Sequence, residues 1–147
     1  MRALIQRVKS ASVTVEEKVI GQIDQGLLIF LGMRHEDHAG QLPWLVEKLI
    51  HLRIFSDDAG KMNRSVQDID GSLLVVSQFT LYGDCRTGRR PSFTETLHPD
   101  QAEPLYNQLI DQLQQKLGVA KIQTGQFGAE MQIELINDGP VTFFIEN

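Results

Sequence analysis

The segment Leu73-Leu-Val-Val-Ser-Gln-Phe-Thr-Leu81 carries the strongest strand signal in the chain. Its first half is a continuous apolar run, a pattern typical of a strand that is buried on both faces of a sheet. A second segment, Gly26-Leu-Leu-Ile-Phe-Leu-Gly32, is also apolar on both sides of the strand alternation. These two segments predict the buried strands of the fold.

Shorter strand patterns and two amphipathic helices surround the buried strands. Apolar residues recur at helical spacing from Leu42 to Ile50 and from Leu105 to Leu117, which predicts two main helices. Further strands are expected at residues 3–8, 13–15, 19–23, 53–55, 131–136 and 141–145. The order of elements predicts a mixed α/β fold with a largely antiparallel sheet. No linker divides the chain, so we expect one compact domain over residues 1–147.

The composition narrows the class of protein. The chain has 147 residues, of which 41% are hydrophobic and 22% charged, as in an ordinary globular domain and unlike a disordered tail or a coiled coil. The one cysteine, Cys85, excludes an internal disulfide and fits a reducing compartment. Arg7 and Lys9 interrupt any apolar run too early for a signal peptide, and no stretch approaches the ~20 apolar residues that span a bilayer. We expect a cytoplasmic protein with no membrane partner.

The charge pattern gives two opposing indications about a nucleic-acid partner. The net charge of −5 argues against one, because phosphate binding usually leaves a basic footprint. Arg86, Arg89 and Arg90, however, form a dense positive patch in a loop, and Lys61 and Arg64 are candidates to extend it. Arginines in such a loop suit phosphate or carboxylate. The alternative is a solvated loop without a ligand.

The first motif that could carry chemistry is Ser77-Gln78-Phe79-Thr80, at the end of the strongest strand. Functional groups are often placed where a strand opens into a loop. The motif offers two hydroxyls, one side-chain amide and main-chain N–H groups that become free as the ladder ends. Such N–H groups can stabilise a developing oxyanion. The alternative is that Ser77 and Thr80 only satisfy local main-chain groups.

The second motif is Asn137-Asp-Gly-Pro-Val-Thr142. Because Pro140 lacks an N–H group, it is excluded from a central ladder position and must lie at a hairpin tip or a bulge. Gly139 tolerates backbone angles that other residues avoid. If the Gly139–Pro140 bond were cis, their carbonyls would point the same way and form a rigid main-chain probe. Base rates favour trans, and the alternative is an ordinary hairpin turn.

Together the two motifs resemble the signature motifs of the D-aminoacyl-tRNA deacylase family. The resemblance extends in the family's order over nearly the whole chain. The matching segments also include Leu4–Val8, Ala11–Val15, Arg53–Asp57, Gly60–Asn63, Arg90–Phe93 and Gln123–Phe127.

The resemblance implies the family's fold and a hydrolase that cleaves the ester between a D-amino acid, or mischarged glycine, and the 3′ end of tRNA. It implies a homodimer in which each active site receives the Gly-Pro turn of the other subunit, and it implies no metal and no cofactor. Carried over by position, Ser77, Gln78, Phe79 and Thr80 are the catalytic residues, and Gly139 and Pro140 come from the partner subunit to select chirality. Further pocket or supporting positions are Arg7, Phe127 and Met131.

Two mechanisms and two other functions stay open. The main-chain N–H groups of Phe79 and Thr80 could receive the negative charge while water attacks with help from the ribose 2′-hydroxyl, or Thr80 could be the nucleophile, although no base adjoins it in sequence. A non-catalytic tRNA-binding module and a structural dimer with exchanged hairpins are the other functions. For a tRNA partner, the acidic balance predicts weak, salt-sensitive contact with the acceptor end through Arg86, Arg89, Arg90, Lys61 and Arg64.

Overall fold

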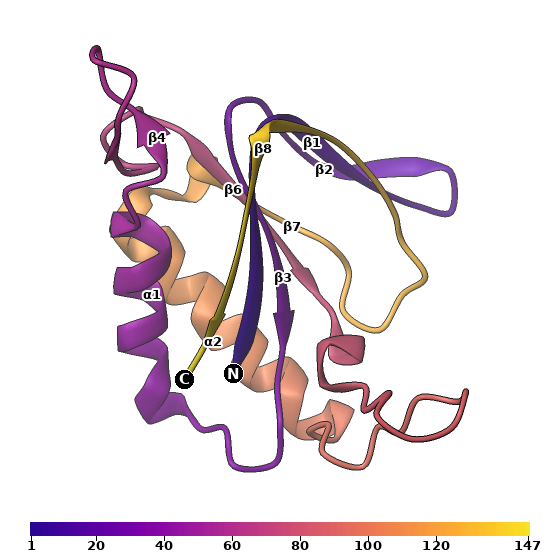
Figure 1. Cartoon of the computed structure of the whole chain (residues 1–147). Coiled ribbons are helices and arrows are strands. Elements are labelled where there is room, and N and C mark those ends of the chain that lie inside the picture. The colour runs from indigo at the N-terminus through magenta and orange to yellow at the C-terminus, as the bar shows by residue number, and fades with distance from the viewer.

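The computed structural model, which describes residues 1–147, is built on one twisted sheet (Figure 1). Its main path runs β2–β1–β3–β6–β7, and β8 pairs with β1. The strands are β1 (Arg2–Val15), β2 (Lys18–Ile23), β3 (Gly26–Gly32), β6 (Ser72–Ser77), β7 (Ile122–Thr124) and β8 (Gln132–Glu146). Three pairings are antiparallel, and only β3–β6 and β6–β7 are parallel. The predicted mixed α/β class with a largely antiparallel sheet is confirmed.

Both predicted helices are present and pack on the same face of the sheet. They are α1 (Leu42–His51) and α2 (Pro99–Leu117). α2 begins six residues before the expected Leu105, with proline at the start of its first turn, where the missing N–H group has no partner to lose. Alternate side chains of β3, such as Leu27 and Ile29, join the helices in a core of 26 buried residues. No helix is both long enough and apolar enough to cross a membrane.

The remaining elements are short. β4 (Phe55–Ser56) and β5 (Met62–Arg64) form a separate two-stranded hairpin, where the sequence predicted a strand at residues 53–55. Single 3-10 turns are η1 (Ala39–Gln41), η2 (Phe79–Tyr82) and η3 (Val119–Lys121). The sequence did not predict β7, whose three residues are too few for a periodic pattern.

The N-terminal strands differ from the prediction. Residues 3–8 and 13–15 belong to one continuous strand, β1, because β8 pairs with it along almost its whole length. Polar residues such as Lys9 and Ser10 interrupt the alternation in the sequence. In the structure they lie where the register between the two strands shifts. Register shifts of this kind let a strand continue through an irregular pattern.

The strongest strand signal, Leu73 to Leu81, also overestimates the strand. β6 ends at Ser77, and the chain turns into η2. The last ladder bond runs from the main-chain N–H of Gln78 to the carbonyl of Leu31, at 2.7 Å. The turn then packs on Gly32, where an added Cβ would lie 3.0 Å from the Gln78 carbonyl oxygen. Glycine at position 32 therefore lets the strand turn sharply at its polar end.

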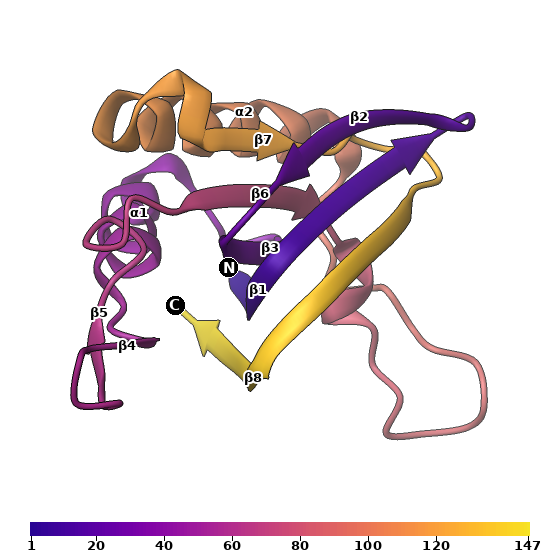
Figure 2. The ribbon, with the colours of Figure 1, turned by 90° about the horizontal axis from the view of Figure 1, so that it is seen from above.

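The C-terminal region corrects a further prediction. The two strands expected at residues 131–136 and 141–145 are one strand, β8, and the motif between them is a bulge rather than a hairpin tip. Val8 pairs with Asn137 and Gln6 with Thr142, so the segment 138–141, here called the Gly-Pro bulge, stands opposite the single residue Arg7. Figure 2 shows the resulting sharp bend in β8. The Gly139–Pro140 peptide bond is cis, and Gly139 has a φ of +147°.

Candidate active site

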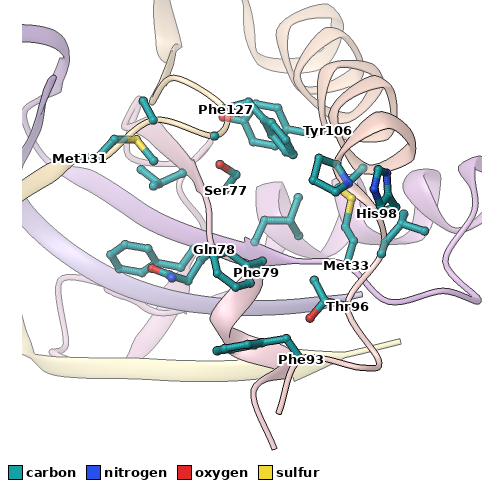
Figure 3. Close-up of a pocket in the computed structure, with 18 of the residues that line it drawn as sticks. Met33, Ser77, Gln78, Phe79, Phe93, Thr96, His98, Tyr106, Phe127 and Met131 are labelled. Carbon is teal, nitrogen blue, oxygen red and sulfur yellow. The ribbon is translucent and has the colours of Figure 1, made fainter. Parts of the chain in front are cut away.

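The polar end of β6 opens into a pocket of about 600 Å³ between the sheet, η2 and the start of α2 (Figure 3). Of the 19 lining residues, 13 are hydrophobic, which suits a ligand with an apolar, flat surface. The pocket is lined by Phe30, Leu31, Met33, Val76, Ser77, Gln78, Phe79, Phe93, Thr96, Leu97, His98, Pro99, Ala102, Tyr106, Phe127, Gly128, Ala129, Met131 and Ile133.

Three of the four predicted catalytic residues, Ser77, Gln78 and Phe79, line this pocket, and Thr80 follows them in η2 without lining it. The Gln78 side-chain amide donates to the Thr80 Oγ1 at 2.5 Å. The main-chain N–H of Leu81 donates to the Gln78 carbonyl. The first N–H groups of a helical turn have no acceptor within that turn. The amides of Phe79 and Thr80 therefore have no acceptor within the turn, and Phe79 itself lines the pocket.

Aromatic rings form two walls of the pocket. Phe79, which is 55% exposed, meets Phe93 edge to face with ring centres 5.0 Å apart. Tyr106 and Phe127 lie with ring centres 5.9 Å apart. The buried Tyr106 Oη donates to the Val75 carbonyl at 2.8 Å, and burial raises the pKa of Tyr106 above its usual value. Tyr106 is therefore a fixed, neutral wall.

The predicted pocket position Met131 also lines the cavity, together with Phe127. In Figure 3, Ser77 lies between Met131 on one side and Phe127 with Tyr106 on the other. Residues that lie 29 to 54 positions from Ser77 in the sequence thus meet around the end of β6.

Arg7 lies elsewhere, at the Gly-Pro bulge. Its buried guanidinium donates from Nε to the Asp138 carbonyl at 2.9 Å and from Nη1 to the Ile54 carbonyl at 2.6 Å. The Asp138 carboxylate is 3.4 Å from the same Nε. Arg7 therefore acts on the bulge and not on the pocket of its own chain. One side chain joins β1, the bulge and the segment that leads into β4.

The Gly-Pro bulge is held at its base and exposed at its tip. The Asn137 Oδ1 accepts from the Val141 main-chain N–H at 2.8 Å, and Val141 is buried. Gly139 and Pro140 are exposed and do not line the pocket of their own chain. In Figure 1 the bend of β8 lies at one end of the sheet. The turn η2, which directly follows β6, lies at the opposite end. Within one chain the two signature motifs are therefore not brought together.

The basic residues fall into two groups. Arg86 forms two bonds with the Asp84 carboxylate, at 2.9 and 2.8 Å, and these bonds lower the pKa of Asp84 to about 2. Arg89 and Arg90 are exposed on the same loop and form no ion pair. Lys61 and Arg64 lie on the β4–β5 hairpin, at the other end of the molecule (Figures 1 and 2). The single patch that the sequence suggested is thus split in two on one chain.

Sequence reasoning missed the contribution of α2 to the pocket. Ala102 and Tyr106 are one helical turn apart and face the cavity together. The predicted helix began at Leu105, so its first turn was not assigned. Phe93 stood in one of the matching segments without an assigned role, although its place directly after the arginine loop was visible in the sequence.

The pocket offers apolar contact, ring faces and free main-chain donors. No group of three or more His, Cys, Asp or Glu side chains is close enough together to hold a metal ion. The side chains in the pocket include one imidazole, His98, which lies 3.3 Å from the Asp100 carboxylate. Free main-chain N–H groups beside an apolar cavity can bind a carbonyl oxygen and stabilise negative charge on it.

Comparisons with known proteins agree over the full length. The family model described as "D-Tyr-tRNA(Tyr) deacylase" matches residues 4–146. A protein of Thermosipho africanus named D-aminoacyl-tRNA deacylase is 53% identical over 147 residues, which are 100% of this chain and 97% of that protein. Its namesake in Halalkalibacterium halodurans is 52% identical, over 100% of this chain and 99% of that protein.

Two solved structures have the same fold. The structure described as "c-Myc DNA Unwinding Element Binding Protein" superposes with a TM-score of 0.95 at 40% identity, covering 100% of this chain and 99% of that one. The structure of a "probable eukaryotic D-amino acid tRNA deacylase" superposes with a TM-score of 0.86 at 17% identity, covering 98% of each chain. At that identity the second likeness shows the fold alone.

Proposed function

Because the chain belongs to the D-Tyr-tRNA(Tyr) deacylase family, we propose that it is a D-aminoacyl-tRNA deacylase, a hydrolase that cleaves the ester between a D-amino acid and the 3′-terminal ribose of tRNA. The observation that carries the proposal is the pocket at the end of β6. There, free main-chain amides adjoin a cavity of about 600 Å³ with aromatic walls.

The pocket suits the end of a charged tRNA. The terminal nucleotide of tRNA is an adenosine, and unpaired bases bind proteins by stacking on aromatic side chains. Phe79 and Phe93 on one side, with Tyr106 and Phe127 on the other, offer such faces. With the adenosine between these walls, the ester on its ribose lies against the turn at Ser77–Phe79. The substrate is thus held by its constant part, independent of the amino-acid side chain.

The chemistry requires little beyond positioning, because an aminoacyl ester is already activated. In the proposed mechanism the amides of Phe79 and Thr80 bind the ester carbonyl oxygen and stabilise the charge that develops when water attacks. The ribose 2′-hydroxyl of the substrate assists the water. Thr80 is a poor candidate for a nucleophile, since its Oγ1 bonds to the Gln78 amide, which cannot take up a proton at neutral pH.

A second copy of the chain supplies the chiral filter. Gly139 and Pro140 are exposed at the end of the sheet opposite their own pocket, so only another copy can bring them to it. Their main-chain atoms would crowd the substrate Cα on the side where an L-residue carries its side chain. A D-residue has hydrogen on that side, and glycine has no side chain, so both are accepted.

The surface supports the homodimer. β8 exposes four large apolar residues, Leu135, Ile136, Phe143 and Phe144, of which Ile136 is 58% exposed. Large exposed apolar side chains are typical of association sites when several of them occur on one strand. In a two-fold dimer each copy gives its bulge and receives the other's, so both pockets are completed at once. The substrate, charged tRNA, places the proposed enzyme in the cytoplasm.

The test is the release of amino acid from purified D-Tyr-tRNA, L-Tyr-tRNA and Gly-tRNA, with a metal chelator present. We expect hydrolysis of the D-ester and the glycyl ester, and release from the L-ester that is slower by about 100-fold or more. Equal rates on the D- and L-esters would contradict the chiral filter. Binding of tRNA without any release would favour the non-catalytic module instead.

A further inference from the structure

The two groups of basic residues are each fixed to one half of the proposed site. Lys61 is exposed at the tip of the β4–β5 hairpin and forms no ion pair. Arg89 and Arg90 are exposed in the loop that follows η2 and also form none. On one chain the β4–β5 hairpin and the loop that follows η2, which carry these free cations, lie at opposite ends of the molecule (Figure 2).

The hairpin is attached to the Gly-Pro bulge. The Arg7 guanidinium bonds to the carbonyl of Ile54, directly before β4, and to the carbonyl of Asp138, directly before Gly139. A single side chain, that of Arg7, therefore bridges the base of the hairpin and the bulge. The hairpin turn is itself ordered, because the Asp57 carboxylate accepts from the main-chain N–H groups of Ala59 and Lys61, each at 2.9 Å. Wherever the bulge docks, the position of Lys61 is fixed with it.

The arginine loop is attached to the pocket. Two main-chain bonds between Asp84 and Ser92, of 2.8 and 2.9 Å, close its base. Phe93 follows directly and lines the pocket against Phe79. Arg89 and Arg90 therefore extend from the rim of the cavity.

We infer that the phosphate-binding surface for the tRNA acceptor end is shared between two copies: Arg89 and Arg90 from the copy that provides the pocket, and Lys61 from the copy that provides the bulge. The inference rests on the proposed function, in which the bulge of one copy enters the pocket of the other. Docking the bulge brings its attached hairpin to the rim from which the arginine loop extends. The unpaired 3′ nucleotides pass between the two groups of cations.

The neighbouring charges explain why these three cations are selected. Arg86 is paired with Asp84, and Arg64 with Asp58 at 2.8 Å, so both are already neutralised. Asp57 directs its carboxylate to main-chain and Asn63 donors within its own turn, which lowers its pKa. The sequence grouped all five basic residues together. The structure separates the paired ones from the free ones.

The first experiment compares Lys61→Glu with the matched control Lys18→Glu, which reverses an exposed, unpaired lysine at the β1–β2 turn. We expect Lys61→Glu to raise KM for D-Tyr-tRNA by about fivefold to tenfold and to reduce the salt dependence of binding, with kcat unchanged. The control should leave KM within about twofold. An unchanged KM in Lys61→Glu overturns the inference.

The second experiment places the substitution on a chosen chain. Ala129→Trp fills the mouth of the pocket from a half-buried position and leaves a mixed dimer with one open pocket, on the chain without it. Two co-expressed mixed dimers, purified through different tags, then carry Lys61→Glu either on the same chain as Ala129→Trp or on the other chain. Both contain the same two substitutions and differ only in their placement.

We expect a raised KM only when both substitutions are on the same chain, because the open pocket then receives the altered hairpin. Equal KM values in the two mixed dimers would overturn the shared surface. So would a raised KM only in the dimer that carries the substitutions on different chains, or a protein that is monomeric in solution. The proposed function fails separately, if the parent protein releases no D-tyrosine from D-Tyr-tRNA.

Discussion

The pocket and the Gly-Pro bulge lie at opposite ends of one sheet and are built in opposite ways. At the pocket, large aromatic rings are exposed to solvent beside free main-chain amides. Phe79 is 55% exposed and Phe93 is 39% exposed. At the bulge, Arg7 and Asn137 bind the main-chain groups at its base. In the proposed function, the pocket end leaves its binding groups free for a substrate and a second copy. The bulge end is held in place before binding, which suits the proposed presentation of main-chain atoms at a fixed position.

The largest effect on the bulge end is expected for Arg7→Met, which removes the guanidinium N–H donors that hold the bulge. The Ile54 carbonyl then lies buried without its partner, and the bulge loses its link to the β4–β5 hairpin. Loss of two charged hydrogen bonds should lower the free energy of unfolding by about 3 kcal/mol, measured by urea denaturation. Arg53→Met, at an exposed arginine without an ion pair, is the control, and an equal effect in both would refute the special role of Arg7.

A narrower disruption is Gly139→Ala. An added Cβ would lie 2.6 Å from the Val141 Cγ2 and 2.7 Å from its main-chain nitrogen, so the tip of the bulge must shift. A shift of this size should reduce kcat/KM for D-Tyr-tRNA by about 100-fold. It should also lower the ratio of kcat/KM for the D-ester to kcat/KM for the L-ester. Gly118→Ala is the control, because Gly118 has a positive φ of +98° with open space around it. Normal activity of Gly139→Ala would count against the bulge as a filter.

At the pocket end, Tyr106→Phe tests whether the aromatic wall is held by its hydroxyl. The substitution removes the bond to the buried Val75 carbonyl and should cost about 1–2 kcal/mol in the free energy of unfolding. Tyr82→Phe is a matched control, since the buried Tyr82 Oη has no hydrogen-bond partner and its removal should cost nothing. If the two variants unfold at the same urea concentration, the wall does not depend on this bond.

The smallest effect is expected for Thr80→Val and Thr80→Ala. If main-chain amides carry the chemistry, both variants should keep single-turnover hydrolysis of D-Tyr-tRNA within about threefold of the parent protein, because neither substitution removes an N–H group. A loss of 1,000-fold or more in both would instead identify Thr80 as the nucleophile.

The sequence predicts the fold best where its pattern is long and local. The apolar run of β3 and the helical spacing of α1 and α2 gave the right elements, because burial on one or both faces leaves a periodic signature. The same rule failed at Phe79–Leu81, where apolar residues form a turn and not a strand. β6 ends where the chain packs closely on Gly32 of the neighbouring strand β3, which has no side chain to prevent this. No local pattern in residues 73–81 encodes that contact.

The candidate site is less predictable, since it depends on which distant residues meet. Phe127 and Met131 were assigned through a family resemblance alone, and the place of Ser77 at a strand end left open whether it only satisfies main-chain groups. The role of Arg7 rests on two carbonyls that are 47 and 131 positions away in the sequence. Proline at position 140 correctly limited the motif to a hairpin tip or a bulge, but only the pairing of β8 with β1 on both sides of it decides for the bulge.

Complementation between two variants tests most directly whether the pocket of one copy is completed by the bulge of another. Ala129→Trp fills the pocket and leaves the bulge intact, whereas Gly139→Ala displaces the bulge and leaves the pocket open. Each homodimer should be nearly inactive on D-Tyr-tRNA. The mixed dimer has one intact pocket that receives one intact bulge, so it should recover about half of the parent activity, with the L-ester still rejected. A mixed dimer as inactive as its two parents would contradict the account.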